Sequence, residues 1–126
     1  MTVGLLLSDD MLFTSRIIGT ARDLQLTIRP ARSAEALYAL AHQETPSCII
    51  VDLANPGLVL ADFMRQVQAL SCPPPRVVAY GSHVDTATLR AAREAGCDPV
   101  WPRSKFVEEL PHALSAWMAE PPSERS

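Results

Sequence analysis

The feature of this sequence that most constrains its fold is a regular alternation of short apolar segments with longer segments of helical spacing. The short segments are rich in aliphatic residues, as strands are, and lie at residues 2–7, 25–29, 47–51, 76–80 and 98–101. Strands that alternate with helices form βα units, which build a parallel sheet covered by helices on both faces. The sequence therefore predicts a doubly wound α/β domain with five parallel strands.

The segments between and after these strands predict five helices. Apolar residues recur at helical spacing in residues 10–24, 33–43, 60–70 and 85–96. Ser33 and Asp85 are typical helix caps, and Gly96 is typical of a left-handed helix end. In the last segment Pro111 interrupts the pattern. Because proline is best tolerated in the first turn of a helix, we expect regular helix mainly from about Leu110 onward.

The length and composition indicate one globular domain. A chain of 126 residues, 48% of them hydrophobic, is large enough to bury a core without disulfides or a structural metal. We expect this domain to span residues 1–119. The polar, proline-containing segment at 120–126 is expected to be a disordered tail.

Charge and cysteine usage exclude several classes of partner. The formal net charge is −3, and the basic residues are spread along the chain, so we expect no binding to nucleic acid. No apolar run approaches the roughly 20 residues that span a bilayer, so we expect no membrane insertion. The three cysteines form no CxxC pair, which indicates neither a disulfide framework nor a zinc cluster and favours a cytoplasmic location.

Three aspartates follow predicted strands. Asp52 comes directly after the apolar segment CIIV, and Asp9 and Asp10 follow the first strand. In open parallel sheets, functional groups gather at the carboxyl ends of the strands. Carboxylates that converge there repel one another unless a cation lies among them, and Mg²⁺ prefers such oxygen ligands. Asp10 is equally typical of a helix cap. Two interpretations of Asp9 and Asp10 therefore stay open, an acidic metal site and a helix cap.

The order and spacing of these features resemble the receiver domain of two-component response regulators over residues 2–118. The matching features are the SDD sequence at 8–10, Asp52 at the phospho-accepting position, Pro56 four residues later, and the segment AREAGCD that ends at Asp98. The resemblance implies a flavodoxin-like (βα)5 fold. It also implies an aspartate that accepts a phosphoryl group while nearby acids hold Mg²⁺.

The sequence departs from this family where the phosphoryl group would be sensed. Receivers use a hydroxyl residue after the fourth strand, an aromatic residue in the fifth strand and a lysine after it. The family spacing places Gly81, Val100 and Arg103 at these three positions. Glycine has no hydroxyl, and the planar guanidinium of arginine is not equivalent to a compact ammonium. Lys105 lies two residues beyond the lysine position.

These departures favour a pseudo-receiver that acts as a protein-interaction module, is not an enzyme and is not switched by phosphorylation. On this hypothesis Arg103 pairs permanently with Asp52. One alternative is an atypical phospho-acceptor at Asp52, with Mg²⁺ held by Asp9, Asp10 and Asp52. A second alternative is a nucleotide-binding or other small-ligand-binding protein of the same fold, although the five glycines form neither GxGxxG nor a P-loop.

The surface that the resemblance implies for a protein partner, or for a second copy in a homodimer, is formed by the fourth helix, fifth strand and fifth helix. Arg90, Arg93 and Trp101 belong to these elements, and Trp117 follows in the last helix. Arginine and tryptophan are frequent interface anchors. Packing within the domain explains the two tryptophans equally well.

Overall fold

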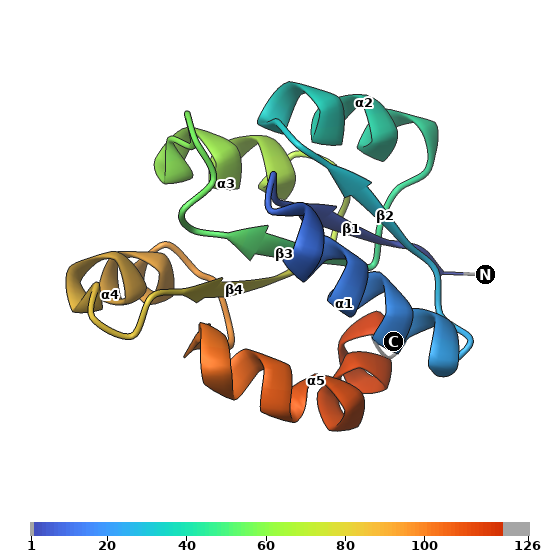
Figure 1. The fold of residues 1–126 in the computed structure, drawn as a ribbon. Helices are drawn as coiled ribbons and strands as arrows, with labels where there is room; N and C mark the ends of the chain where they lie inside the picture. Colours follow the sequence, from blue (N-terminus) through green and yellow to red (C-terminus); the bar gives the residue numbers. More distant parts are fainter. Residues whose placement is uncertain (1, 120–126) are drawn as a thin grey trace.

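The computed structural model describes residues 2–119, which form one five-stranded sheet between two layers of helices (Figure 1). The strands run parallel in the order β2-β1-β3-β4-β5. They are β1 Gly4–Leu7, β2 Ile28–Ala31, β3 Cys48–Asp52, β4 Arg76–Gly81 and β5 Val100–Pro102. The predicted doubly wound parallel sheet is therefore confirmed.

Helices α1 and α5 cover one face of the sheet, and α2, α3 and α4 cover the other (Figure 1). The helices are α1 Met11–Asp23, α2 Ala34–Gln43, α3 Leu60–Gln68, α4 Thr86–Glu94 and α5 Arg103–Met118. The side chains of Ser33 and Asp85 accept hydrogen bonds from Ala36 N and Thr88 N, as expected of caps. Gly96, with φ +107°, follows α4 in the left-handed conformation that glycine adopts without steric cost.

The sheet is buried on both faces, which explains the continuous apolar character of its central strands. In β3, Ile49 and Val51 pack toward α2, α3 and α4, whereas Cys48 and Ile50 pack toward α1 and α5. Every residue of β1 and β3 is buried, including Asp52 at the end of β3. A charged group at the end of such a strand therefore lies at the boundary between the core and one edge of the sheet.

The expected start of the last helix is wrong, because α5 begins at Arg103 and passes through Pro111. Proline lacks the backbone N–H that would bond to the carbonyl four residues earlier. The exposed ring of Pro111 faces away from the core, and the buried residues on either side keep the helix against the sheet. These buried residues are Phe106, Leu110, Leu114, Trp117 and Met118. Tertiary packing therefore overrides the local cost of this proline.

The second strand begins at Ile28, three residues later than expected. Residues 24–26 continue the end of α1 instead, since the amides of Leu24 and Leu26 donate to the carbonyl of Ala21. Between them Gln25 adopts a positive φ of 62°, as residues that close a helix often do. The pattern QLTIR therefore contains a helix end followed by the first residues of a strand.

Two further expectations concern membrane-spanning helices and the end of the chain. In the described part of the chain, residues 2–119, none of the helices is both long and apolar enough to cross a membrane. The predicted tail at 120–126 lies outside the described residues.

Candidate functional site

The carboxylate of Asp52 lies at the carboxyl edge of the sheet, where the side chain is only 4% exposed. One oxygen, Oδ2, accepts a hydrogen bond of 3.0 Å from Ser8 Oγ, and Ser8 directly follows β1. The other, Oδ1, accepts a hydrogen bond of 2.9 Å from the backbone N–H of Ala54. This second bond spans two residues, as in turns closed by an aspartate side chain. Both oxygens of Asp52 therefore have donors.

Arg103, the first residue of α5, approaches the same carboxylate. Its Nη2 lies 3.8 Å from Asp52 Oδ1, a separation typical of an ion pair and too long for a hydrogen bond. The guanidinium carbon lies 5.3 Å from the ring centroid of Phe13 and 5.8 Å from that of Tyr80. A cation within about 6 Å of an aromatic face is attracted by the ring. Three side chains from α1, β3 and β4 therefore hold the guanidinium.

Tyr80 belongs to the part of the site that sequence reasoning missed. It pairs in register with Asp52 across β3 and β4, and it is fully buried. Its ring lies 4.8 Å from that of Phe13 and 4.7 Å from that of Phe106, measured between centroids. Burial raises the pKa of the Tyr80 hydroxyl far above its ordinary value, so this group stays neutral at physiological pH.

Asp9 and Asp10 lie at the surface next to this site. Asp10 Oδ1 accepts a hydrogen bond of 3.0 Å from Phe13 N and caps α1, which is the capping role considered for it. Within residues 2–119, no three His, Cys, Asp or Glu side chains are grouped to hold a metal ion. The acids Asp9, Asp10 and Asp52 are thus not gathered as magnesium ligands. In this arrangement the residues do not fit Mg²⁺, because a guanidinium faces the buried carboxylate.

Two apolar side chains border a small cavity of about 50 Å³ beside Gly81, the hydroxyl position of the family. A Cβ atom added at Gly81 would lie 3.4 Å from Leu53 Cδ1 and 3.4 Å from Leu89 Cδ2. The neighbouring Ser82 is exposed, and its hydroxyl accepts a hydrogen bond from Val84 N. Leu53 and Leu89 therefore limit the room for a longer side chain at Gly81.

We expect Gly81→Thr to lower the free energy of unfolding by about 1 to 2 kcal/mol, because its hydroxyl and methyl groups would overpack the space between Leu53 and Leu89. Urea unfolding followed by circular dichroism measures this change. In a Leu53→Ala background the same substitution should cost less, since the alanine leaves room. An equal cost in both backgrounds would show that Leu53 does not limit the room beside residue 81.

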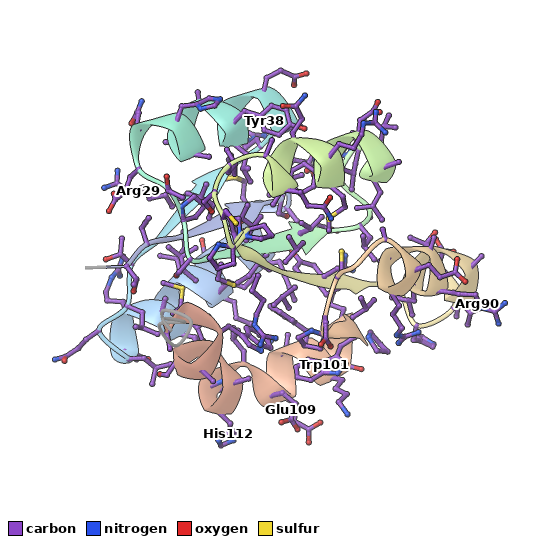
Figure 2. The ribbon with its side chains drawn as sticks, turned by 180° about the vertical axis from the view of Figure 1, so that it is seen from behind. Arg29, Tyr38, Arg90, Trp101, Glu109 and His112 are labelled. Carbon is purple, nitrogen blue, oxygen red and sulfur yellow. The ribbon has the colours of Figure 1, made fainter. Side chains whose placement is uncertain are left out.

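Some side chains of the predicted partner face make contacts within the domain. The guanidinium of Arg93 donates a hydrogen bond of 2.9 Å to the carbonyl of the buried Val100. The ring of Trp101 lies 5.6 Å from that of Trp117, and Lys105 Nζ lies 5.4 Å from the Trp101 ring. In Figure 2, Arg90 projects outward from α4, whereas Trp101 lies against α5.

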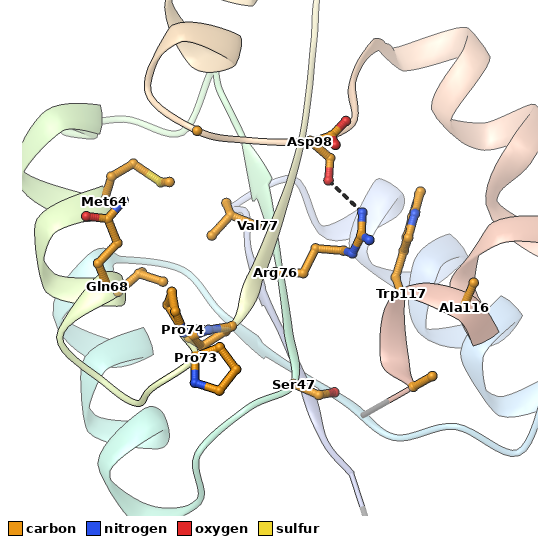
Figure 3. A pocket seen from close by; sticks show the side chains of 14 residues that line it. Ser47, Met64, Gln68, Pro73, Pro74, Arg76, Val77, Asp98, Ala116 and Trp117 are labelled. Carbon is orange, nitrogen blue, oxygen red and sulfur yellow. Dashed lines mark hydrogen bonds between the residues drawn. The ribbon is translucent and has the colours of Figure 1, made fainter. Parts of the chain in front are cut away.

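A cavity of about 510 Å³ lies elsewhere, beside the amino ends of β3 and β4 (Figure 3). Residues 73–75, Met64 and Trp117 contribute apolar lining. Arg76, at the start of β4, donates a hydrogen bond of 3.0 Å to the carbonyl of Asp98 beside it. Because Asp52 does not line this cavity, we place the candidate site at the carboxyl edge of the sheet.

No protein-family model and no curated protein matches this sequence. Solved structures do match. A Chloroflexus aurantiacus protein assigned as a response regulator has a TM-score of 0.79 and 18% identity, over 94% of this chain and 98% of that one. The receiver domain of the Francisella response regulator 1452 has a TM-score of 0.77 and 14% identity, over 94% of this chain and 97% of that one. The chemotaxis response regulator CheY4 of Vibrio cholerae has a TM-score of 0.75 and 17% identity, over 93% of this chain and 98% of that one. The chain therefore has the flavodoxin-like fold of receiver domains.

Proposed function

We propose that this chain is a receiver-like signalling domain that acts as a protein-interaction module and is not switched by phosphorylation. The observation that carries the proposal is that both oxygens of the Asp52 carboxylate already have partners within the domain. Its oxygens accept hydrogen bonds from Ser8 Oγ and Ala54 N, and the Arg103 guanidinium lies beside Oδ1. A carboxylate that attacks a phosphoryl donor needs one oxygen free and aligned with the bond that breaks.

The surroundings of Arg103 support a lasting pair. The guanidinium lies against the rings of Phe13 and Tyr80. A phosphoryl group on Asp52 would add about 1.5 to 2 negative charges and three oxygen atoms at this point. This group would need space beside Oδ1, where the guanidinium now lies.

The positions that would report a phosphoryl group lack the necessary side chains. Gly81 has no hydroxyl, and the apolar side chains of Leu53 and Leu89 border the adjoining space. Val100, at the aromatic position of the family, is a buried aliphatic residue in β5. A phosphoryl group on Asp52 would therefore find no hydroxyl at residue 81 to draw inward and no aromatic ring at residue 100 to follow it.

In this proposal the chain is not an enzyme and acts in the cytoplasm. Two of its thiols are poor nucleophiles, because burial raises the pKa of Cys48 to about 12 and that of Cys97 to about 11. A thiol with such a pKa stays protonated near neutral pH, whereas the thiolate is the reactive form. The activity that we propose is binding to another protein.

Intact-mass spectrometry after incubation with Mg²⁺ and acetyl phosphate tests this proposal. We expect no gain of the roughly 80 Da that one phosphoryl group adds, because Asp52 is occupied by its present partners. A competent receiver domain treated in parallel verifies the donor, and circular dichroism verifies folding. An adduct on the wild-type protein that is absent from Asp52→Ala would disprove the non-switching function.

A further inference from the structure

The cavity in Figure 3 lies beside an incomplete part of the sheet, at the edge opposite Asp52. Strand β5 pairs with β4 only from Ala79 onward, so the first residues of β4 have no strand beside them on that side. The carbonyl of Val77 accepts a hydrogen bond of 2.9 Å from Asp98 N at this point. The short β5 therefore leaves room for a cavity of about 510 Å³ between the amino end of β4 and the helices around it.

Most of the residues that line this cavity are apolar. Met64 and Val77 line it on the α3 side of β4, and Trp117 lines it on the α5 side. Residues 73–75 are three consecutive prolines, which have no backbone N–H to donate, so this edge does not favour the addition of a peptide strand. A volume between about 300 and 1,000 Å³ with few polar groups in an apolar lining is typical of a small-molecule site.

Two charged residues of opposite sign also line the cavity. They are Arg76 and Asp98, which are both exposed and lie on the Trp117 side of β4 (Figure 3). Among residues 2–119, neither of them belongs to a salt bridge. A hydrogen bond of 3.0 Å from Arg76 Nη1 to the carbonyl of Asp98 holds the guanidinium and leaves its other N–H groups for a ligand. The cavity therefore offers one cation and one anion that do not pair with each other.

Three helices end beside this cavity. Gln68 is the last residue of α3, Trp117 lies near the end of α5, and Gly96 follows α4. The carbonyl groups at the carboxyl end of a helix carry partial negative charge and favour a cation. They would oppose a phosphate group or a lone carboxylate, and they would favour an ammonium group. The ligand that fits this end of the fold therefore carries a positive charge as well as a negative one.

We propose that the cavity binds a small zwitterion with an apolar side chain, the chemical class of the apolar α-amino acids. The guanidinium of Arg76 would bind the ligand carboxylate, and the carboxylate of Asp98 would bind the ligand ammonium group, as charge-assisted hydrogen bonds. The apolar side chain of the ligand would lie against Trp117 and the prolines at 73–75. This site lies at the opposite edge of the sheet from Asp52, so it goes beyond the proposed function.

Isothermal titration calorimetry with L-phenylalanine and L-leucine tests the proposal. Each amino acid is compared with the matching acid that lacks the ammonium group and the matching amine that lacks the carboxylate. For phenylalanine these are 3-phenylpropionate and phenethylamine. We expect saturable binding of at least one of the two amino acids at millimolar concentration. Its two single-charge analogues should bind at least about tenfold more weakly, because each loses one charge-assisted hydrogen bond.

Four variants locate the binding site. Arg76→Met and Asp98→Asn each remove one charge, and Ala116→Phe places a ring in the cavity without changing its charge. We expect each of these three to weaken binding at least about tenfold. Arg90→Ala, at an exposed position on α4, should bind as the wild type does. Circular dichroism verifies that every variant is folded, and the changed residues are all exposed.

Several results would overturn the inference. They are no binding of either amino acid, equal affinity for a single-charge analogue, or wild-type affinity in Arg76→Met, Asp98→Asn or Ala116→Phe. A wild-type dimer in sedimentation that Ala116→Phe does not form would mean that a second copy covers the cavity, which also contradicts a small-molecule site.

The titration contains neither Mg²⁺ nor a phosphoryl donor, and Asp52 takes no part in it. Its failure would therefore refute the amino-acid site and leave the non-switching function intact. A phosphoryl adduct on Asp52 in the mass experiment would refute the non-switching function, whatever the titration shows.

Discussion

Phe106→Ala is expected to lower the free energy of unfolding by about 3 to 5 kcal/mol, the largest effect that we expect of a single substitution. The side chain of Phe106 is fully buried in the first half of α5. Its ring lies 4.7 Å from that of Tyr80 and 5.9 Å from that of Trp117, measured between centroids. Alanine would leave a cavity between α5 and the sheet, which urea unfolding would report as a lower midpoint.

Ser115→Ala, on the exposed face of the same helix, is the matched control and should change stability by less than about 0.5 kcal/mol. If Phe106→Ala cost less than about 1 kcal/mol, the part of α5 that precedes Pro111 would contribute little packing. That result would favour the later helix start, near Leu110, that the proline predicts.

Arg103→Met is expected to lower the free energy of unfolding by about 2 kcal/mol. The substitution keeps an apolar chain but leaves the buried Asp52 carboxylate without a cation, which is costly in a protein interior. It also removes the attraction of the guanidinium to Phe13 and Tyr80. The Arg103 side chain is 41% exposed, so solvent screening keeps the loss below that of a fully buried pair.

A double-mutant cycle isolates the contribution of the pair. Asp52→Asn is combined with Arg103→Met, and we expect the two changes to be non-additive by about 1 to 2 kcal/mol. Arg90→Met, at an exposed position on α4, should be close to neutral. Additive effects of the two substitutions would show that Arg103 and Asp52 neither stabilise each other nor form a permanent pair.

The fold was largely predictable because the alternation of apolar strands and helical segments is clear wherever the strands are fully buried. The strand CIIV is apolar at every position because helices cover both faces of the sheet. The pattern failed where local and tertiary preferences disagree. Pro111 is unfavourable inside a helix, yet the buried residues around it hold the helix together. Gln25 adopts a backbone conformation that its sequence context does not reveal.

The candidate site was predictable only in part. Asp52 followed from its place after the third strand, and Arg103 from the spacing of the family that the sequence resembles. The structure brings their side chains to 3.8 Å. Ser8 was missed because a serine beside two aspartates does not stand out as a donor. Phe13 and Tyr80 were missed because their approach to the guanidinium depends on how α1 packs beside β4, which no local pattern encodes.

The direct junction of β5 and α5 has a mechanical consequence. Pro102 ends β5 and Arg103 begins α5, so no loop separates the strand from the helix whose first residue carries the guanidinium. A helix of 16 residues is a rod about 24 Å long. The pair of Arg103 with Asp52 ties the first turn of this rod to the end of β3, while Trp117 packs near its far end. The helix is therefore anchored to the sheet at both of its ends.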